Sequence, residues 1–544
     1  MKNRSYSLKQ AATLGLFLLI IFIAGLLMFS NLTNGVIWYW GGDFAQYIMQ
    51  AKSILDGSTQ NFVEANRIAI EQTSVNLAPV AYPWGFPLLL APVYALWGLN
   101  LVALKVVCII SYLLFLVVLW FGFRKVHPTP WFLYLMFIFT LNPFLISFSD
   151  NILSDLPFLL LSTLSIILIQ TIVVQNRHII SNFWSYFLIG FVITSAYLVR
   201  TAGILLLVTL GISQVVSYIQ KQLHSGEAIL KKDRPKLSLK TIAFYKRISI
   251  KFLLLHLTPY VIFFFSITIL LRVFPDNGNS YASEIKYVSI DSLVSNFNYY
   301  ARLLRDFFIG FPYPYYKVVY KITIPLAIAG AAWRYKLYYP AIIYIILSFI
   351  LYIIYPHKGN LRFLIPILPF YISFVLLGLE ALCNRMTVLK EQIRKPLCYL
   401  PVVLVILFFG FNVYGQNNAY VNLHKIKNDE GVLGPTAQEM YAFISNNTKS
   451  TDTIIYWYPR VMRFITGRQS CSVHKIDQLI RGDYLVVHPK GNEFNDRQVP
   501  QSQLESLITK GDARLVFENI NYKVYQLNKK KIINNSQNHT QDNI

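Results

Sequence analysis

Charged residues are scarce in this chain, and acidic residues are the scarcest. Of its 544 residues 14% are charged, with 26 Asp or Glu against 49 Lys or Arg. The four cysteines have neither the spacing of a disulfide framework nor that of a zinc site. Hydrophobic residues make up 55% and the mean hydropathy is +0.45, which is more apolar surface than a soluble domain of this size can bury. The composition therefore predicts an integral membrane protein.

Apolar runs long enough to cross a bilayer recur along most of the chain. A transmembrane helix needs about 20 mostly apolar residues, and we expect an α-helical polytopic membrane protein with about eleven such helices. The predicted spans are 11–30, 102–123, 131–148, 156–175, 182–198, 202–219, 252–272, 319–333, 337–355, 362–383 and 397–414.

The net charge of +23 would suit a nucleic-acid-binding protein, but the basic residues are sorted by loop. The stretch from Lys221 to Lys251 carries nine Lys or Arg against Glu227 and Asp233. An excess of Lys and Arg in cytoplasmic loops is the positive-inside rule. The charge therefore predicts topology and contact with membrane lipids, and no nucleic-acid partner is expected. The N-terminus is placed in the cytoplasm, and the loop 31–87 and the C-terminal region on the other side.

The composition changes after the last predicted span. "TAQEMYAFISNN" has a helical pattern, while "TDTIIYWY", "GDYLVVHP", "ARLVFEN" and "NYKVYQLN" are short β-rich runs separated by turns. We therefore expect a membrane domain at 1–414, with 31–87 as its large first outer loop, and a small extracytoplasmic α/β domain at 415–528. The polar, low-complexity tail 529–544 is predicted to be disordered.

A carboxylate opens the first helical pattern of the outer loop, "GGDFAQYIMQAKSILDG". From Phe44 onward apolar residues recur on one helix face, which predicts an amphipathic helix in the interface plane. Asp43 with Gln46 fits a variant of the capping box, and Asp is a favoured N-cap. A catalytic carboxylate is the alternative. Spacing alone favours the cap.

Two further carboxylates, Asp150 and Asp155, stand in the next outer turn, "SFSDNILSDLPF". Ionisable groups at bilayer depth are costly, so those that are present usually pair or line a cavity. Asp155 also fits an N-cap, because Pro157 follows it near the first helical position. Pairing and capping therefore both remain open for this turn.

Basic residues occur on the outer side as well, against the general bias. Arg200 lies between two spans, and "YPHKGNLRF" places His357, Lys358 and Arg362 just before another span. Arg200 alone is also explained by snorkelling to the headgroups. Together the four basic groups favour a phosphate ligand, which guanidinium groups bind in a bidentate manner.

The outward-facing motifs follow one another along nearly the whole chain. They are "GGDFAQYIMQAKSILDG", "YPWGFPLLLAPVYALWG", "LSDLPFLLL", "VRTAGILLL", "RFLIPILPF" and, in the C-terminal region, "YPRVMRFITGR". This series resembles the GT-C superfamily of polytopic membrane glycosyltransferases. The likeness is to the bacterial branch near the protein O-mannosyltransferases, glycosyltransferase family 39, and the lipid A aminoarabinose transferase.

The resemblance implies an enzyme that moves a sugar from a polyprenyl-phosphate donor to an acceptor hydroxyl. The acceptor would be a lipid, a glycan or a protein side chain, and the reaction would take place on the extracytoplasmic face of a bacterial inner membrane. No cofactor is implied with certainty, although two outer carboxylates leave Mg²⁺ or Mn²⁺ open.

The resemblance also implies roles for particular residues. Asp43 maps to the general base, and Asp155, more securely than Asp150, to a second catalytic carboxylate that orients the acceptor or stabilises positive charge on the sugar. The donor phosphate would be bound by Arg200, His357, Lys358 and Arg362, and the site would be lined by Tyr47, Asp150 and Tyr82. "HKGNLRF" is similar to a His-Lys-Glu-x-Arg-Phe motif of dolichol-linked mannosyltransferases, but Gly359 replaces its acid and one residue is added.

A multi-span lipid or solute transporter, or flippase, is the alternative. Such a protein is expected to show internal repeats, charges at mid-span and little mass outside the membrane. The sequence shows no internal repeat, and its predicted spans carry almost no charge near their centres. Both features favour the glycosyltransferase.

Overall fold

The structure is a computed structural model, and it describes residues 2–36, 42–74, 79–177, 179, 181–232, 250–275, 288–308, 315–355, 358–385, 432–488, 499 and 501–529. These ranges leave out the predicted span 397–414, His357 and the tail from residue 530. They also leave out residues 37–41 and 75–78 of the predicted outer loop and residues 415–431, 489–498 and 500 of the predicted C-terminal domain.

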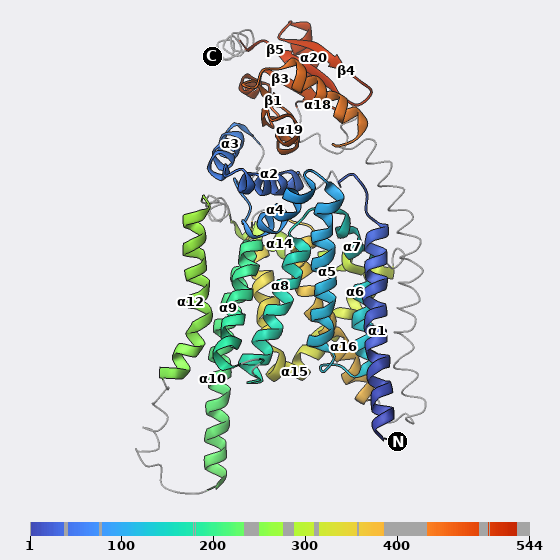
Figure 1. The fold of residues 1–544 in the computed structure, drawn as a ribbon, viewed down its shortest axis with the longest axis vertical. Helices are drawn as coiled ribbons and strands as arrows, with labels where there is room; N and C mark the ends of the chain where they lie inside the picture. The colour runs from blue at the N-terminus through green and yellow to red at the C-terminus, as the bar shows by residue number, and fades with distance from the viewer. Residues whose placement is uncertain are drawn as a thin grey trace.

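A bundle of long apolar helices forms the body of the protein (Figure 1). In the described part of the chain, nine helical segments are long and apolar enough to cross a membrane. The bundle comprises α1 (Lys2–Ser30), α5 (Leu101–Phe123), α6 (Thr129–Leu141), α7 (Pro143–Ser147), α8 (Asp155–Leu168), α9 (Asn182–Val199), α10 (Ile204–Lys232), α12 (Ile250–Val273), α15 (Tyr315–Ile354) and α16 (Leu368–Arg385). The α-helical membrane fold predicted from composition is confirmed.

The longest element, α15, is a helical hairpin. A continuous helix of its 40 residues would hold Tyr320 and Ile353 about 50 Å apart. Both residues contact α14 (Ile290–Leu303), where the Tyr320 hydroxyl donates to the Ala301 carbonyl and the Asn296 side chain donates to the Ile353 carbonyl. The chain therefore reverses within α15, at the non-helical backbone of Arg334 and Tyr338. Two separate spans, 319–333 and 337–355, were predicted for this segment.

Short helices cover the end of the bundle opposite the N-terminal end of α1 (Figure 1). They are α2 (Asp43–Leu55), α3 (Thr59–Gln72), α4 (Gly85–Trp97) and α14. α2 begins at Asp43 as predicted, but it lies between the bundle and the C-terminal domain. Polar positions such as Gln46, Gln50 and Ser53 are consequently buried together with the apolar ones.

The C-terminal domain is a small α/β unit above these helices (Figure 1). Its sheet has the order β2-β1-β3-β5-β4, parallel across β2, β1 and β3 and antiparallel across β3, β5 and β4. The strands are β1 (Thr453–Ile455), β2 (Gln469–Cys471), β3 (Tyr484–Val487), β4 (Ala513–Glu518) and β5 (Lys523–Leu527), and the helices are α18 (Pro435–Asn447), α19 (Pro459–Thr466) and α20 (Gln501–Thr509). The predicted α/β domain is confirmed.

One cysteine forms a disulfide bond that the sequence did not predict. Cys108 and Cys471 are free and buried, whereas Cys383 in α16 is disulfide-bonded. Cysteine spacing had indicated no disulfide framework, and it gave no sign of this bond.

Candidate active site

Asp43 does not cap the helix that it opens. The N-cap is Gly42, with a left-handed φ of 81°, and no side chain caps this helix end. Gln46, the expected partner in a capping box, instead donates to the carbonyls of Pro79 and Val80 at 3.2 and 3.4 Å. The capping interpretation of Asp43 is therefore wrong. Its carboxylate Oδ1 accepts a hydrogen bond from the Tyr82 hydroxyl at 2.6 Å.

Asp155 opens α8 in the same way, and its carboxylate is also turned away from the helix end. The N-cap of α8 is Ser154, whose side chain forms no hydrogen bond to the helix end. The Asp155 side chain is fully buried and pairs with the guanidinium groups of Arg200 and Arg362. Arg200 stands in extended backbone between α9 and the 3-10 turn η4 (Thr201–Gly203). Capping is wrong for Asp155, and pairing, the other expectation for an ionisable group at this depth, is confirmed.

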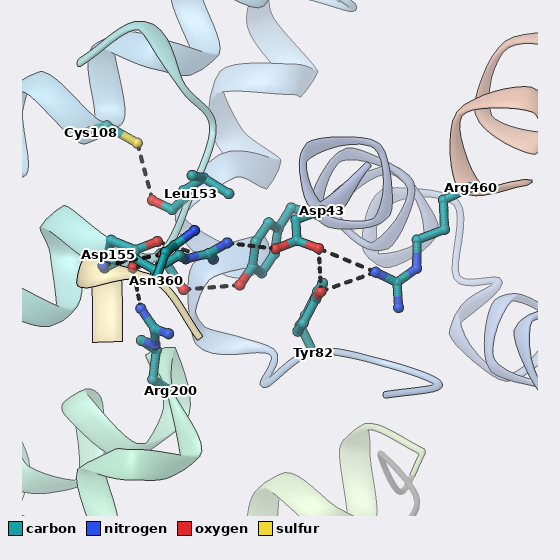
Figure 2. A network of polar contacts seen from close by, with 11 residues as sticks. Asp43, Tyr82, Cys108, Leu153, Asp155, Arg200, Asn360 and Arg460 are labelled. Carbon is teal, nitrogen blue, oxygen red and sulfur yellow. Dashed lines mark hydrogen bonds and ion pairs between the residues drawn. The ribbon is translucent and has the colours of Figure 1, made fainter. Parts of the chain in front are cut away.

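Arg362 joins the two carboxylates. It lies in the first turn of η7 (Leu361–Ile367), where the Asn360 side chain accepts its backbone N–H. Its Nη1 is 3.0 Å from Asp43 Oδ2, and its Nη2 is 3.2 Å from Asp155 Oδ2. Figure 2 shows the resulting chain of contacts from Asp43 to Arg200. Four predicted site residues, far apart in the sequence, thus come together at one end of the bundle.

Arg460 belongs to the same network, and sequence reasoning missed it. It lies in α19 of the C-terminal domain, and its Nη1 is 3.3 Å from Asp43 Oδ1 and 3.1 Å from the Tyr82 hydroxyl (Figure 2). The motif "YPRVMRFITGR" was noted as a family feature, but no residue in it was assigned a role. A contact between residues 417 positions apart leaves no local pattern that could have revealed it.

Tyr47 and Tyr82, predicted to line the site, stack on each other. Their ring centroids are 4.5 Å apart with an interplanar angle of 27°. The Tyr47 hydroxyl forms a hydrogen bond with Ser154 at 2.9 Å. Burial, and after it the charge of Asp43, raises the pKa of Tyr47 well above its usual value. Its hydroxyl therefore stays protonated across the physiological range.

The other predicted site residues lie elsewhere. Asp150 is fully buried in a cluster with Lys105, whose Nζ is 2.6 Å away, and with the backbone N–H and hydroxyl of Thr33, each at 2.8 Å. This cluster fastens the segment after α1 to α5. Lys358 is exposed and donates to the Ser295 hydroxyl at 2.8 Å. His357 lies outside the described residues.

The charges of the network suit an anion better than a metal ion. Three guanidinium groups outnumber two carboxylates by one charge, and each of these side chains is at most 15% exposed. Divalent Mg²⁺ and Mn²⁺ need several free oxygen ligands, but here the carboxylate oxygens face guanidinium groups. Within the described ranges no group of three or more His, Cys, Asp or Glu residues is placed to hold a metal. The residues present therefore do not fit the metal site left open by the sequence.

Solved structures of two membrane glycosyltransferases share this fold. ArnT from Cupriavidus metallidurans, in the apo state and bound to undecaprenyl phosphate, matches with TM-scores of 0.53 and 0.54 over 94% of this chain and 98% of ArnT, at 11% identity. The archaeal oligosaccharyltransferase AglB from Archaeoglobus fulgidus, in complex with an inhibitory peptide and a dolichol-phosphate, matches with a TM-score of 0.51 over 87% of this chain and 69% of AglB, at 11% identity.

Sequence comparison alone gives no relative, since neither a protein-family model nor a curated protein sequence matches the chain. The structural matches nevertheless run over almost the whole molecule. The chain therefore has the GT-C fold, and the predicted resemblance is confirmed at the level of the fold.

Proposed function

We propose that this GT-C-fold protein is a glycosyltransferase that moves a sugar from a polyprenyl-phosphate donor to an acceptor hydroxyl, with Asp43 as general base. One observation carries the proposal: Arg362 bridges Asp43 and Asp155, so that a base and a phosphate-binding group share one site. The neighbours add support, because the ArnT and AglB structures contain undecaprenyl phosphate and a dolichol-phosphate.

The proposed reaction needs a base and a cationic group, but no acid. The acceptor oxygen attacks the anomeric carbon, and the bond from that carbon to the phosphate oxygen breaks as positive charge develops on the sugar. The acceptor proton passes to the Asp43 carboxylate. The bonding electrons leave with the polyprenyl phosphate, which is already an anion. Arg200 and Arg362 then offset its charge.

Binding of the donor would also release the base. Asp43 Oδ2 accepts a hydrogen bond from Arg362. A donor phosphate that pairs with this guanidinium would free Oδ2 to accept the proton of the acceptor hydroxyl. The single surplus positive charge of the network is the charge that a lipid phosphate would neutralise.

Asp155 is better suited to holding the arginines than to touching the acceptor. Its side chain is fully buried, and it pairs with both Arg200 and Arg362. We propose that it positions the two guanidinium groups for the phosphate, in place of the acceptor-orienting role implied by the family resemblance.

The charge pattern supports a site on the extracytoplasmic side of the membrane. The site lies at the end of the bundle opposite the N-terminal end of α1 (Figure 1). With a cytoplasmic N-terminus, as the positive-inside rule predicts, the reaction takes place on the extracytoplasmic face of the inner membrane. The acceptor there is a lipid, a glycan or a protein side chain.

The test is release of polyprenyl phosphate by the purified, reconstituted protein supplied with polyprenyl-phosphate sugars and candidate acceptors. Asp43→Asn keeps the side-chain shape, and we expect it to lower the rate by about a hundredfold or more. Asp56→Asn is the matched control, because Asp56 is exposed at the other end of α2. Equal release by wild type and Asp43→Asn would refute the assigned base. No release with any donor would favour the transporter instead.

A further inference from the structure

We infer that Arg460 is a positioning residue for Asp43, so that the C-terminal domain completes the active site instead of only covering it. This inference rests on the proposed function. It concerns a residue to which neither the sequence motifs nor the proposed reaction assigns a role.

The helix that carries Arg460 packs directly against the start of α2. A Cβ atom at Gly42 would lie 3.2 Å from Val461 Cγ2 and 3.5 Å from Arg460 Cβ. On the other side of Asp43, the ring of Phe44 packs edge-on against that of Phe464, with centroids 6.3 Å apart. Residues of α19 therefore contact both chain neighbours of Asp43.

Arg460 itself is held at several points. It is 9% exposed, its guanidinium lies over the Tyr82 ring at 5.4 Å, and its Nη2 donates to the Pro79 carbonyl at 3.4 Å. Its Nη1 contacts Asp43 Oδ1 and the Tyr82 hydroxyl, which also donates to Oδ1. Asp43 Oδ1, the Tyr82 hydroxyl and Arg460 Nη1 thus form a closed triangle of contacts (Figure 2).

The two oxygens of Asp43 are thereby given different partners. Oδ2 faces Arg362, the group that the donor phosphate would take, and Oδ1 faces Arg460 and Tyr82. Once Arg362 turns to the phosphate, Arg460 and Tyr82 still fix the carboxylate. A base must be held within a fraction of an ångström of its working position, because a displacement of about 1 Å can cost about a hundredfold in rate.

Docking of the C-terminal domain does not depend on Arg460 alone. Arg463, one turn further along α19, donates to the Asn66 side chain in α3 and is half-buried. Other contacts between the domain and the first loop are Ser74 N–H to the Ser472 carbonyl at 2.9 Å, Gln469 to the Ala65 carbonyl at 3.0 Å and Arg481 to the Gln72 carbonyl at 2.9 Å. Arg463→Gln is thus a matched control that weakens docking without touching Asp43.

The first test measures turnover of full-length protein with a polyprenyl-phosphate sugar that wild type uses. We expect Arg460→Gln to lower kcat by tenfold to about a hundredfold while the donor KM changes less than about threefold. Arg460→Lys should restore part of the loss, and Arg463→Gln should keep kcat near wild type. Equal kcat in Arg460→Gln and wild type, or an equal loss in Arg463→Gln, would overturn the inference. Loss in Asp43→Asn alone would leave the proposed function standing.

The second test needs no activity, so it decides whether Arg460 holds Asp43 even if the proposed function fails. Thermal unfolding is measured for Asp43→Asn, Arg460→Gln and the double variant, and for the same cycle with Arg463→Gln. Because Arg460 and Asp43 share a contact, the Tm losses of the first cycle should fall short of additivity. Those of the second cycle should add. Additive losses in both cycles would show that Arg460 does not hold Asp43.

Discussion

Arg362→Gln removes the group that joins the two carboxylates, and its effect on stability can be worked out from the structure. Three contacts are lost: Nη1 to Asp43 Oδ2 at 3.0 Å, and Nε and Nη2 to Asp155 at 3.2 Å each. Removing one partner of a buried ion pair typically costs about 3–5 kcal/mol. Arg200 still pairs with Asp155 and Arg460 with Asp43, so we expect the lower end, about 3 kcal/mol.

An exposed pair provides the comparison. Arg67 and Glu64 are 3.1 Å apart in α3, and their side chains are 50% and 53% exposed. Surface ion pairs contribute about 0–1 kcal/mol, so Arg67→Gln should lower the free energy of unfolding by less than about 1 kcal/mol. Arg362→Lys should fall between the two, because a single ammonium restores the charge but does not reproduce the fork that reaches both carboxylates.

Denaturant unfolding in mixed micelles measures the three variants under one condition, and phosphate release measures their activity. The proposed phosphate-binding role predicts that Arg362→Gln loses about a hundredfold or more in turnover, because the charge of the leaving phosphate would no longer be offset. An unfolding free energy within 1 kcal/mol of wild type would refute the bridging role. Near-normal turnover in a folded Arg362→Gln protein would refute the phosphate-binding role.

Three further expectations concern residues outside this pair. Lys105→Met should lower the free energy of unfolding by about 3–5 kcal/mol because it removes the cation that pairs with the buried Asp150. The double variant Lys105→Met with Asp150→Leu should recover much of that loss, and no recovery would contradict the pairing. Gly42→Ala should lower the free energy of unfolding by about 1–2 kcal/mol through strain at φ 81°, and it should also lower turnover by displacing α19. Gly467→Ala, at φ 69° with open space around its Cβ position, should cause only the strain. Equal turnover in the two variants would argue against the close approach of α19 to Gly42. Burial raises the pKa of Cys471 to about 12, so thiolate is scarce at pH 8 and mass spectrometry should detect its alkylation by iodoacetamide only after unfolding; rapid labelling of the native protein would contradict this.

The fold was largely predictable from the chain because its signals are local. Apolar runs marked the described spans, and short β-rich runs marked the C-terminal sheet. Arg200 and Arg362 were also identifiable, because basic residues on the outer side contradict the charge bias of the loops. The sequence predicted two spans where α15 lies, because Arg334 and Lys336 interrupt the apolar run.

The errors arose where a local motif competed with tertiary contacts. Asp43 and Asp155 have the sequence context of helix caps, yet both begin their helices one residue after the cap and turn their carboxylates toward arginines. Asp150 and Asp155 stand five residues apart, but one pairs with Lys105 and the other with Arg200 and Arg362. Spacing could not distinguish their partners, because the cations that pair with each carboxylate come from different parts of the chain.

By itself the sequence determined the class of protein, the positions of its long apolar helices in the described part of the chain and the identity of most charged groups in the candidate site. The class and the helices follow from hydrophobicity and periodicity, which act over a few residues along the chain. The charged groups follow from their place in the outer loops and from the family resemblance. Only the tertiary structure decided which carboxylate meets which arginine, and that Arg460 of the C-terminal domain reaches Asp43. Those pairings join residues 319 and 417 positions apart, and they are set by how helices and domains pack, because buried charges must find partners wherever packing brings them together.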